Sequence, residues 1–212
     1  YVCFRITGYR PTETVSAKIK GDDLRHDLRL FVEDLSDSAD MTAENIGEQV
    51  LTEAEADRYA AQCEALLRGS AAAYAALPPS EVLVTCGARA NLSVKPSALT
   101  SRFDPISPER SVQHAAQRLR PILRAAAESG AFINLDMEQY ELRDLTLELA
   151  KHLLASPDGA SAGRLGIVLQ AYLRDAETMT QELLNWLRVH ERSLTIRLVK
   201  GAYWDTEVAQ AR

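Results

Sequence analysis

Residues 195–206, TIRLVKGAYWDT, decide the fold, because they predict a buried strand that ends on residues suited to a ligand. The β-branched and apolar residues of this segment are typical of a strand, yet Arg197 stands in the middle of it. A buried arginine is costly unless an anion or a strong acceptor meets it. Gly201 then allows close approach of the backbone to a ligand, and Asp205 can cap a new helix. An ordinary buried strand with a satisfied arginine is the alternative interpretation.

Three further strands are predicted upstream, at 91–95, 131–136 and 165–170, and a helical pattern follows each one. The first of these helices begins at Ser107 and Pro108 and stops at Gly130. Near-continuous apolar strands that alternate with helices imply a parallel sheet with its helices packed outside. No G-x-G-x-x-G motif follows any strand, so a (β/α)8 TIM-type barrel is favoured over a doubly wound sheet. The predicted class is α/β, with the first four β/α units of such a barrel present.

A polar residue closes each of the four predicted strands: Lys95, Asp136, Gln170 and Lys200. In a β/α barrel, the residues that handle ligands gather at the C-terminal ends of the strands. Any one of these residues could simply meet water. Four polar residues at the equivalent position of four successive strands, however, predict one shared pocket.

The chain divides by its pattern into a mainly helical N-terminal region, 1–79, and the barrel half, 80–212. Within the first region, 22–35 carries an apolar helical stripe, whereas 1–20 carries no decisive pattern. The residues Thr52-Glu-Ala-Glu55 form a capping box that predicts a helix running to about Ala76.

Composition excludes several classes of function. The formal charge is −6 over 212 residues with both signs interspersed, so nucleic acid is a poor partner. The three cysteines and four histidines show no metal-ligand spacing, which predicts no metal site and suits a reducing compartment.

The chain begins at Tyr1 and ends at Arg212, just after a predicted helix start, which favours a fragment of a longer protein.

The residues RLVKGAYWD, 197–205, resemble the flavin-binding signature of proline dehydrogenase, including the dehydrogenase domain of bifunctional proline-utilisation proteins. The resemblance extends over about 45–212, with weaker matches at the three earlier strands, 93–99, 134–138 and 169–172. It implies a distorted (β/α)8 barrel that holds non-covalent FAD. It also implies oxidation of L-proline to Δ1-pyrroline-5-carboxylate by hydride transfer to flavin N5, the first step of proline catabolism.

The resemblance assigns roles residue by residue. The implied catalytic residues are Lys95, Asp136 and Arg197. The implied cofactor-binding residues are Gln170, Arg197, Val199, Lys200, Gly201, Ala202 and Trp204. The implied substrate-binding residues are Lys95, Leu198 and Tyr203, and Glu48 matches a Leu-Gly-Glu element that precedes the barrel. The proton acceptor for the substrate amine is unassigned, with Glu138 and Tyr172 near the site in sequence. Pro96 departs from the family pattern and would remove a ladder donor beside Lys95.

The resemblance further implies quinone or another electron acceptor as a partner, and it allows an aldehyde dehydrogenase domain in the same parent chain. It suggests a cytoplasmic protein that can be peripheral to the inner membrane. Because the later strands of the barrel lie beyond Arg212, we expect these 212 residues alone not to turn over proline. Two alternatives stay open: a lyase or aldolase that forms a Schiff base on Lys200 or Lys95, and a non-catalytic interaction module.

Overall fold

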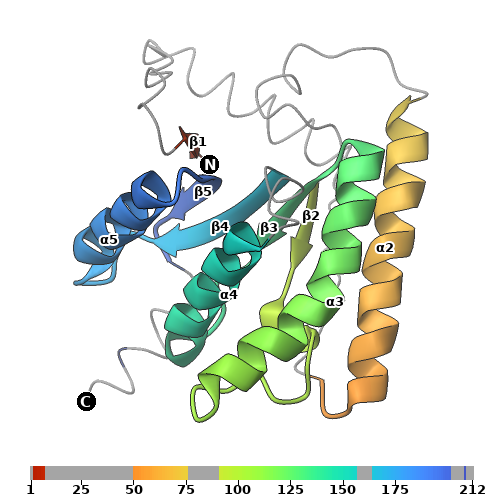
Figure 1. The fold of residues 1–212 in the computed structure, drawn as a ribbon, viewed down its shortest axis with the longest axis horizontal. Helices are drawn as coiled ribbons and strands as arrows, with labels where there is room; N and C mark the ends of the chain where they lie inside the picture. The colour runs from red at the N-terminus through yellow and green to blue at the C-terminus, as the bar shows by residue number, and fades with distance from the viewer. Residues whose placement is uncertain (1, 8–49, 76–90, 157–163, 202–207, 209–212) are drawn as a thin grey trace.

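The computed structural model describes residues 2–7, 50–75, 91–156, 164–201 and 208 (Figure 1). The parallel strands are β2 (Asn91–Val94), β3 (Phe132–Leu135), β4 (Leu165–Gln170) and β5 (Ser193–Val199). The helices are α2 (Glu53–Ala75), α3 (Pro108–Ser129), α4 (Arg143–Ala155) and α5 (Ala176–Val189). A further strand, β1 (Val2–Thr7), lies at one edge.

The sheet has the order β1-β5-β4-β3-β2, and β3, β4 and β5 each pair in parallel with the preceding strand along the chain. Helix α3 follows β2, α4 follows β3 and α5 follows β4, so the predicted β/α alternation is confirmed. Figure 1 shows α2 lying beside α3, with α4 across the same side of the sheet. Helix α3 ends at Gly130 with φ 67°, as the sequence predicted. The fold class, the first four units of a β/α barrel, is confirmed.

Alternate residues of each strand separate two environments. The set that includes Ile133, Ile167 and Ile196 packs into the hydrophobic core with the helices. The other set forms rows across the sheet, because the strands pair in register. One row contains Ser93, Asn134, Gly166 and Thr195. The candidate site therefore lies on the face that the helices do not cover.

Strand β1 is an element that the sequence pattern did not predict. It pairs antiparallel with β5, with Val2 opposite Leu198 and Thr7 opposite Ser193. An exposed strand edge offers unpaired backbone donors and acceptors to any extended segment. This strand depends on the neighbouring edge of β5, and for that reason local periodicity gave no sign of it.

Gly166 leaves room for side chains from β3. A Cβ at this position would lie 2.4 Å from Asn134 Oδ1 and 2.8 Å from the Phe132 ring. Both neighbours are buried, so neither can move away without disturbing the inner face. We expect Gly166→Ala to lower the free energy of unfolding by about 2 kcal/mol, measured by urea denaturation. Gly69→Ala, which meets nothing within 4 Å in α2, is the matched control and should not destabilise.

Helix α2 begins with the predicted capping box. The Glu55 N–H donates to Thr52 Oγ1 at 3.2 Å, and the Thr52 N–H donates to Glu55 Oε2 at 3.0 Å. Farther along α2, Tyr59, Cys63 and Leu67 join the same core as α3. The predicted helix at 22–35 lies outside the described residues.

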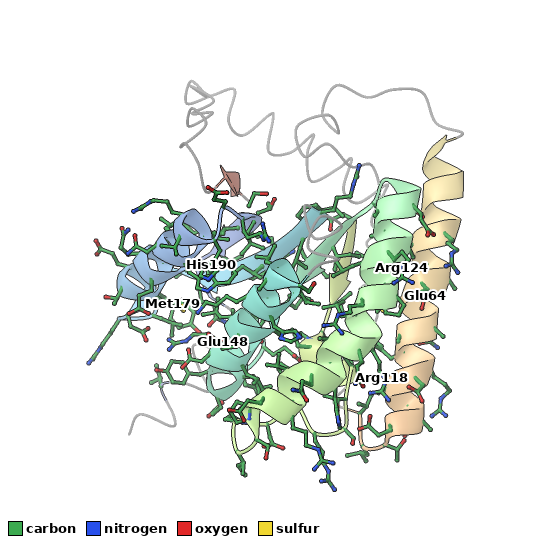
Figure 2. All side chains as sticks on the ribbon, in the orientation of Figure 1. Glu64, Arg118, Arg124, Glu148, Met179 and His190 are labelled. Carbon is green, nitrogen blue, oxygen red and sulfur yellow. The ribbon has the colours of Figure 1, made fainter. Side chains whose placement is uncertain are left out.

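Glu53 joins the start of α2 to the barrel. Its carboxylate accepts hydrogen bonds from Ser101 N at 2.9 Å and Ser101 Oγ at 2.5 Å, and it pairs with Arg118 Nη1 at 2.7 Å. Figure 2 shows Arg118 extending from α3 towards the N-terminal end of α2. The Ser101 hydroxyl, then the Ser101 amide and Arg118, lower the pKa of Glu53 to about 2 against the effect of burial.

This lowered pKa predicts an acid-sensitive contact. The stabilisation is complete above the ordinary glutamate pKa of 4.5, and it is lost as pH falls through about 2. Because Glu53 is partly exposed, we expect a contribution of only about 1 kcal/mol. Urea unfolding at several pH values from about 6 down to about 2 measures the effect. The free energy of unfolding should fall less steeply with decreasing pH for Glu53→Gln than for wild type. Glu128→Gln, at an exposed position on α3, should leave the decline unchanged.

Candidate functional site

A cluster of four charged residues lies at the C-terminal ends of the parallel strands, and we call it the charge cluster: Lys95, Asp136, Glu138 and Arg197. Arg197 Nη2 donates to Asp136 Oδ1 at 3.0 Å. Arg197 lies on β5 and Asp136 directly after β3, so the contact joins two strands that both pair with β4. The arginine predicted to need an anion therefore has one.

The carboxyl group of Asp136 has an unusual environment. Burial raises the pKa of Asp136 above its usual range, while Arg197, a hydrogen bond from Ser93 and the charge of Lys95 oppose that rise. Its cationic neighbours therefore offset part of the cost of burying this carboxyl group. Its side chain is only 24% exposed, which makes those neighbours effective.

Glu138 lies beside the turn that follows β2. Its Oε2 accepts the Ser97 N–H at 3.0 Å, and its Oε1 accepts the Ser97 hydroxyl at 2.5 Å. Burial raises the pKa of Glu138, while the two Ser97 bonds and the Lys95 charge oppose the rise and Asp136 adds to it. Glu138 therefore ties the end of β3 to the turn carrying Lys95.

Pro96 does not disturb the sheet. Strand β2 ends at Val94, so Pro96 lies beyond the ladder and removes no ladder hydrogen bond. It begins a short 3-10 turn, Pro96–Ala98, and Lys95 precedes it in an extended conformation. The residue before a proline is restricted to that region. The departure from the family pattern thus fixes the backbone of Lys95.

Gln170 is the last residue of β4 and is 2% exposed. Its Oε1 makes no hydrogen bond within the part of the chain that the structure describes. A buried amide oxygen without a donor is costly, because it has lost water without gaining a partner. This oxygen is therefore an acceptor available to a bound ligand.

The end of β5 lies close to the turn after β4. Ala171 N donates to Val199 O at 2.8 Å, and Tyr172 N donates to Lys200 O at 3.0 Å. Gly201 adopts φ 142°, and a Cβ there would lie 1.1 Å from the Tyr172 ring. Only glycine permits this approach, so Tyr172 covers the end of β5.

Not every predicted site residue joins this group. Leu198 alternates with Arg197 along β5, on the face of Ile196, and is 42% exposed. Lys200 is exposed, and its backbone carbonyl makes the contact with Tyr172. The remaining predicted positions lie outside the described residues: Glu48, Ala202, Tyr203, Trp204 and Asp205.

Sequence reasoning missed Tyr59 as a neighbour of the site. Its hydroxyl accepts the Lys95 N–H at 3.1 Å, although the two residues are far apart in the chain. Burial, and then Cys63, raises the pKa of Tyr59, so the phenol stays protonated. The available signal was a tyrosine on the inward stripe of a helix, since a buried tyrosine hydroxyl usually needs a polar partner.

Arg143 was also missed, and it ties two loops at the same end of the sheet. Its Nη1 donates to both oxygens of Asp175 at 2.9 and 2.7 Å, and its Nε donates to Asp144 at 2.9 Å. The guanidinium also lies 4.8 Å from the centre of the Tyr140 ring. The side chain of Arg143 is 10% exposed, so its charge relies on these partners.

We expect Arg143→Met to lower the free energy of unfolding by about 2 kcal/mol, since Asp175 is partly solvated and would lose its buried partner. Thermal unfolding at neutral pH provides the measurement. Arg124→Met, at an exposed position on α3, is the matched control. Equal stability of the two variants would contradict this role for Arg143.

Parallel strands with polar ends and outer helices define half of a β/α barrel, and comparison with known proteins identifies the family. The family model for proline dehydrogenase matches residues 32–212, so the chain belongs to the proline dehydrogenase family. The bifunctional protein PutA of Escherichia coli strain K12 is 32% identical over 121 residues, covering 57% of this chain and 9% of that protein.

Solved structures give the same result. The chain is similar to proline utilization A from Bdellovibrio bacteriovorus inactivated by N-propargylglycine, with 34% identity and a TM-score of 0.70. The proline utilization A mutant D779W from Bradyrhizobium japonicum gives 31% identity and a TM-score of 0.67. These matches cover 78% of this chain but only 18% and 16% of the two proteins. The chain therefore spans less than a fifth of these relatives.

Among the described residues, no helix has the length and apolar character needed to cross a membrane. The same part of the chain contains no group of three or more histidine, cysteine or acidic residues arranged to hold a metal ion.

Proposed function

We propose that the protein containing this chain oxidises L-proline to Δ1-pyrroline-5-carboxylate with FAD as its cofactor. The observation that carries this proposal is the match of the proline dehydrogenase family model to residues 32–212. The charge cluster is consistent with it, because an amino acid substrate brings both a carboxylate and an amine. The predicted catalytic residues Lys95, Asp136 and Arg197 all belong to that cluster.

The described residues fit a flavin. The buried Gln170 Oε1 would accept a hydrogen bond from the N–H of the pyrimidine edge of the isoalloxazine ring. Val199 ends β5, and Lys200 and Gly201 follow it; these three residues keep the cofactor-binding roles that the resemblance implies, with the Tyr172 ring packed against Gly201. Ala202 and Trp204 keep the cofactor-binding roles that the resemblance implies.

Lys95 and Arg197 would have different electrostatic roles, one towards the substrate and one towards the cofactor. The Lys95 ammonium would bind the proline carboxylate, with Leu198 and Tyr203 in substrate-binding roles by resemblance. FAD, when bound, supplies the acceptor for the hydride that leaves the carbon next to the proline nitrogen. Arg197, held by Asp136, would place a fixed positive charge beside the ring and favour the electron-rich state.

The visible spectrum of the full-length protein tests this proposal. We expect an oxidised flavin band that bleaches on anaerobic addition of L-proline, with production of Δ1-pyrroline-5-carboxylate. D-proline at the same concentration is the control and should bleach the band far more slowly. A protein without flavin, or a band indifferent to L-proline, would refute the proposal.

We also propose a parent chain that carries an aldehyde dehydrogenase domain, which the resemblance allows, because the Escherichia coli relative named above is a bifunctional protein. Within the present chain, the boundary between the helical N-terminal region and the barrel half would fall near residue 80, between α2 and β2. Quinone or another acceptor would reoxidise the flavin, in a cytoplasmic protein that can contact the inner membrane peripherally. A Schiff-base lyase is the other candidate, and borohydride trapping of a carbonyl substrate on Lys95 or Lys200 would support it. The exposed position of Lys200 does not favour that chemistry.

A further inference from the structure

The direction of the Lys95 side chain depends on a three-residue turn. Lys95 has φ −87° and ψ 116°, and the 3-10 turn Pro96–Ala98 begins directly after it. All three residues of that turn are buried. A lysine side chain is flexible, so the backbone from which it starts decides the volume its ammonium can reach. The contacts that hold this turn therefore determine where the Lys95 ammonium can lie.

Two side chains from different parts of the fold hold the turn. Tyr59, 4% exposed on α2, accepts the Lys95 N–H through its hydroxyl at 3.1 Å. Glu138, from the segment after β3, accepts both the N–H and the hydroxyl of Ser97. Ser97 is 3% exposed, so water cannot easily replace either bond. The turn is thus held at Lys95, the residue that precedes it, and at its second residue, Ser97.

The geometry of Glu138 favours holding over proton transfer. Each of its oxygens already accepts a hydrogen bond from Ser97, one of them at 2.5 Å. A proton taken from a substrate would weaken the carboxylate as an acceptor and release the turn. A general base keeps an oxygen available to the proton that it removes. Glu138 acts through Ser97 instead.

We propose that Tyr59 and Glu138 are positioning residues that fix Lys95 and the turn after it, Pro96–Ala98, and thereby direct the Lys95 ammonium towards the substrate carboxylate. This inference rests on the proposed function, because it assumes that Lys95 meets that carboxylate. Helix α2 then contributes to the substrate site through one phenol hydroxyl, although it precedes the barrel strands in sequence.

The test uses Tyr59→Phe and Glu138→Gln in the full-length protein. A contact with the carboxylate that is equal in the ground state and the transition state affects KM rather than kcat. For each variant we therefore expect KM for proline to rise about ten-fold, with kcat within about two-fold of wild type. Flavin content should be unchanged. Tyr140→Phe and Glu128→Gln, at exposed positions, are the matched controls and should leave KM unchanged.

Hydrogen exchange supplies a readout that does not depend on catalysis. The backbone amides of Lys95 and Ser97 should exchange about ten-fold faster in Tyr59→Phe and Glu138→Gln respectively. Ser97→Ala, which removes only the hydroxyl contact, covers the case in which Glu138→Gln does not fold. The double variant Ser97→Ala, Glu138→Gln should raise KM by less than the product of the two single effects. The reason is that both substitutions affect the same contact, between Ser97 and Glu138.

Two results would overturn the inference. Unchanged amide exchange in both variants would show that neither side chain holds the turn. A loss of kcat at constant KM in Glu138→Gln, together with loss of one limb of the pH profile, would make Glu138 an acid–base group. If wild-type flavin were indifferent to proline, the proposed function would fail, while the exchange data would still decide what holds the turn.

Discussion

In the full-length protein, Gly201→Ala is expected to displace Tyr172 from the end of β5 and to lower the affinity for FAD, the proposed cofactor, by about 100-fold, which corresponds to strain of about 3 kcal/mol. The added Cβ would overlap the Tyr172 ring, at 1.1 Å from one of its carbons, and φ 142° is unfavourable for alanine. The ring and the end of β5 cannot both keep their positions. Flavin absorbance per protein, after dialysis at known FAD concentrations, measures the loss.

Gly130→Ala distinguishes the effect of the positive φ from the effect of the overlap with Tyr172. Gly130 also has a positive φ, 67°, but a Cβ there would have its nearest neighbour at 4.0 Å. This control should lose about 1 kcal/mol of stability and keep its FAD. Similar FAD loss in both variants would show that the contact with Tyr172 is irrelevant.

Arg197→Met is expected to lower kcat/KM for proline by about 1,000-fold, since it removes the fixed cation proposed to lie beside the flavin. It would also leave Asp136 buried without its guanidinium partner. Burial already raises the pKa of Asp136, and the loss of Arg197 removes the largest opposing effect. A carboxyl with a raised pKa destabilises the fold as pH rises through that pKa. The variant should therefore lose more stability at pH 7 than at a pH of about 4.

A second substitution distinguishes charge from packing. Asp136→Asn in the Arg197→Met background removes the unpaired carboxylate, and we expect it to restore most of the lost stability at neutral pH. Activity should stay low, because the cation is still missing. Recovery of activity in the double variant would contradict a direct role for Arg197. Unfolding curves and steady-state rates give the two readouts.

The sequence allowed the barrel half to be predicted closely because its signals are local. Strand 165–170 coincides with β4, and the helix start at Pro108 and the stop at Gly130 follow from backbone preferences of those residues. The alternation of strands with helices then implied parallel pairing and one shared ligand end. Lys95 and Asp136 could be expected at one end of the sheet for the same reason, whereas the role of Arg197 was implied by the resemblance.

Contacts between residues distant in the chain were decided by tertiary structure alone. β1 exists through the edge of β5, which no pattern within residues 1–20 reveals. Tyr59 meets Lys95 only because α2 packs against the same core as α3. The sequence by itself determined, to within one residue, where each of the four parallel strands ends, because alternation and turn preferences depend on neighbouring residues. Only the packed structure decided that Glu138 holds Ser97 and that Tyr172 covers Gly201, because register and loop approach depend on how whole elements pack.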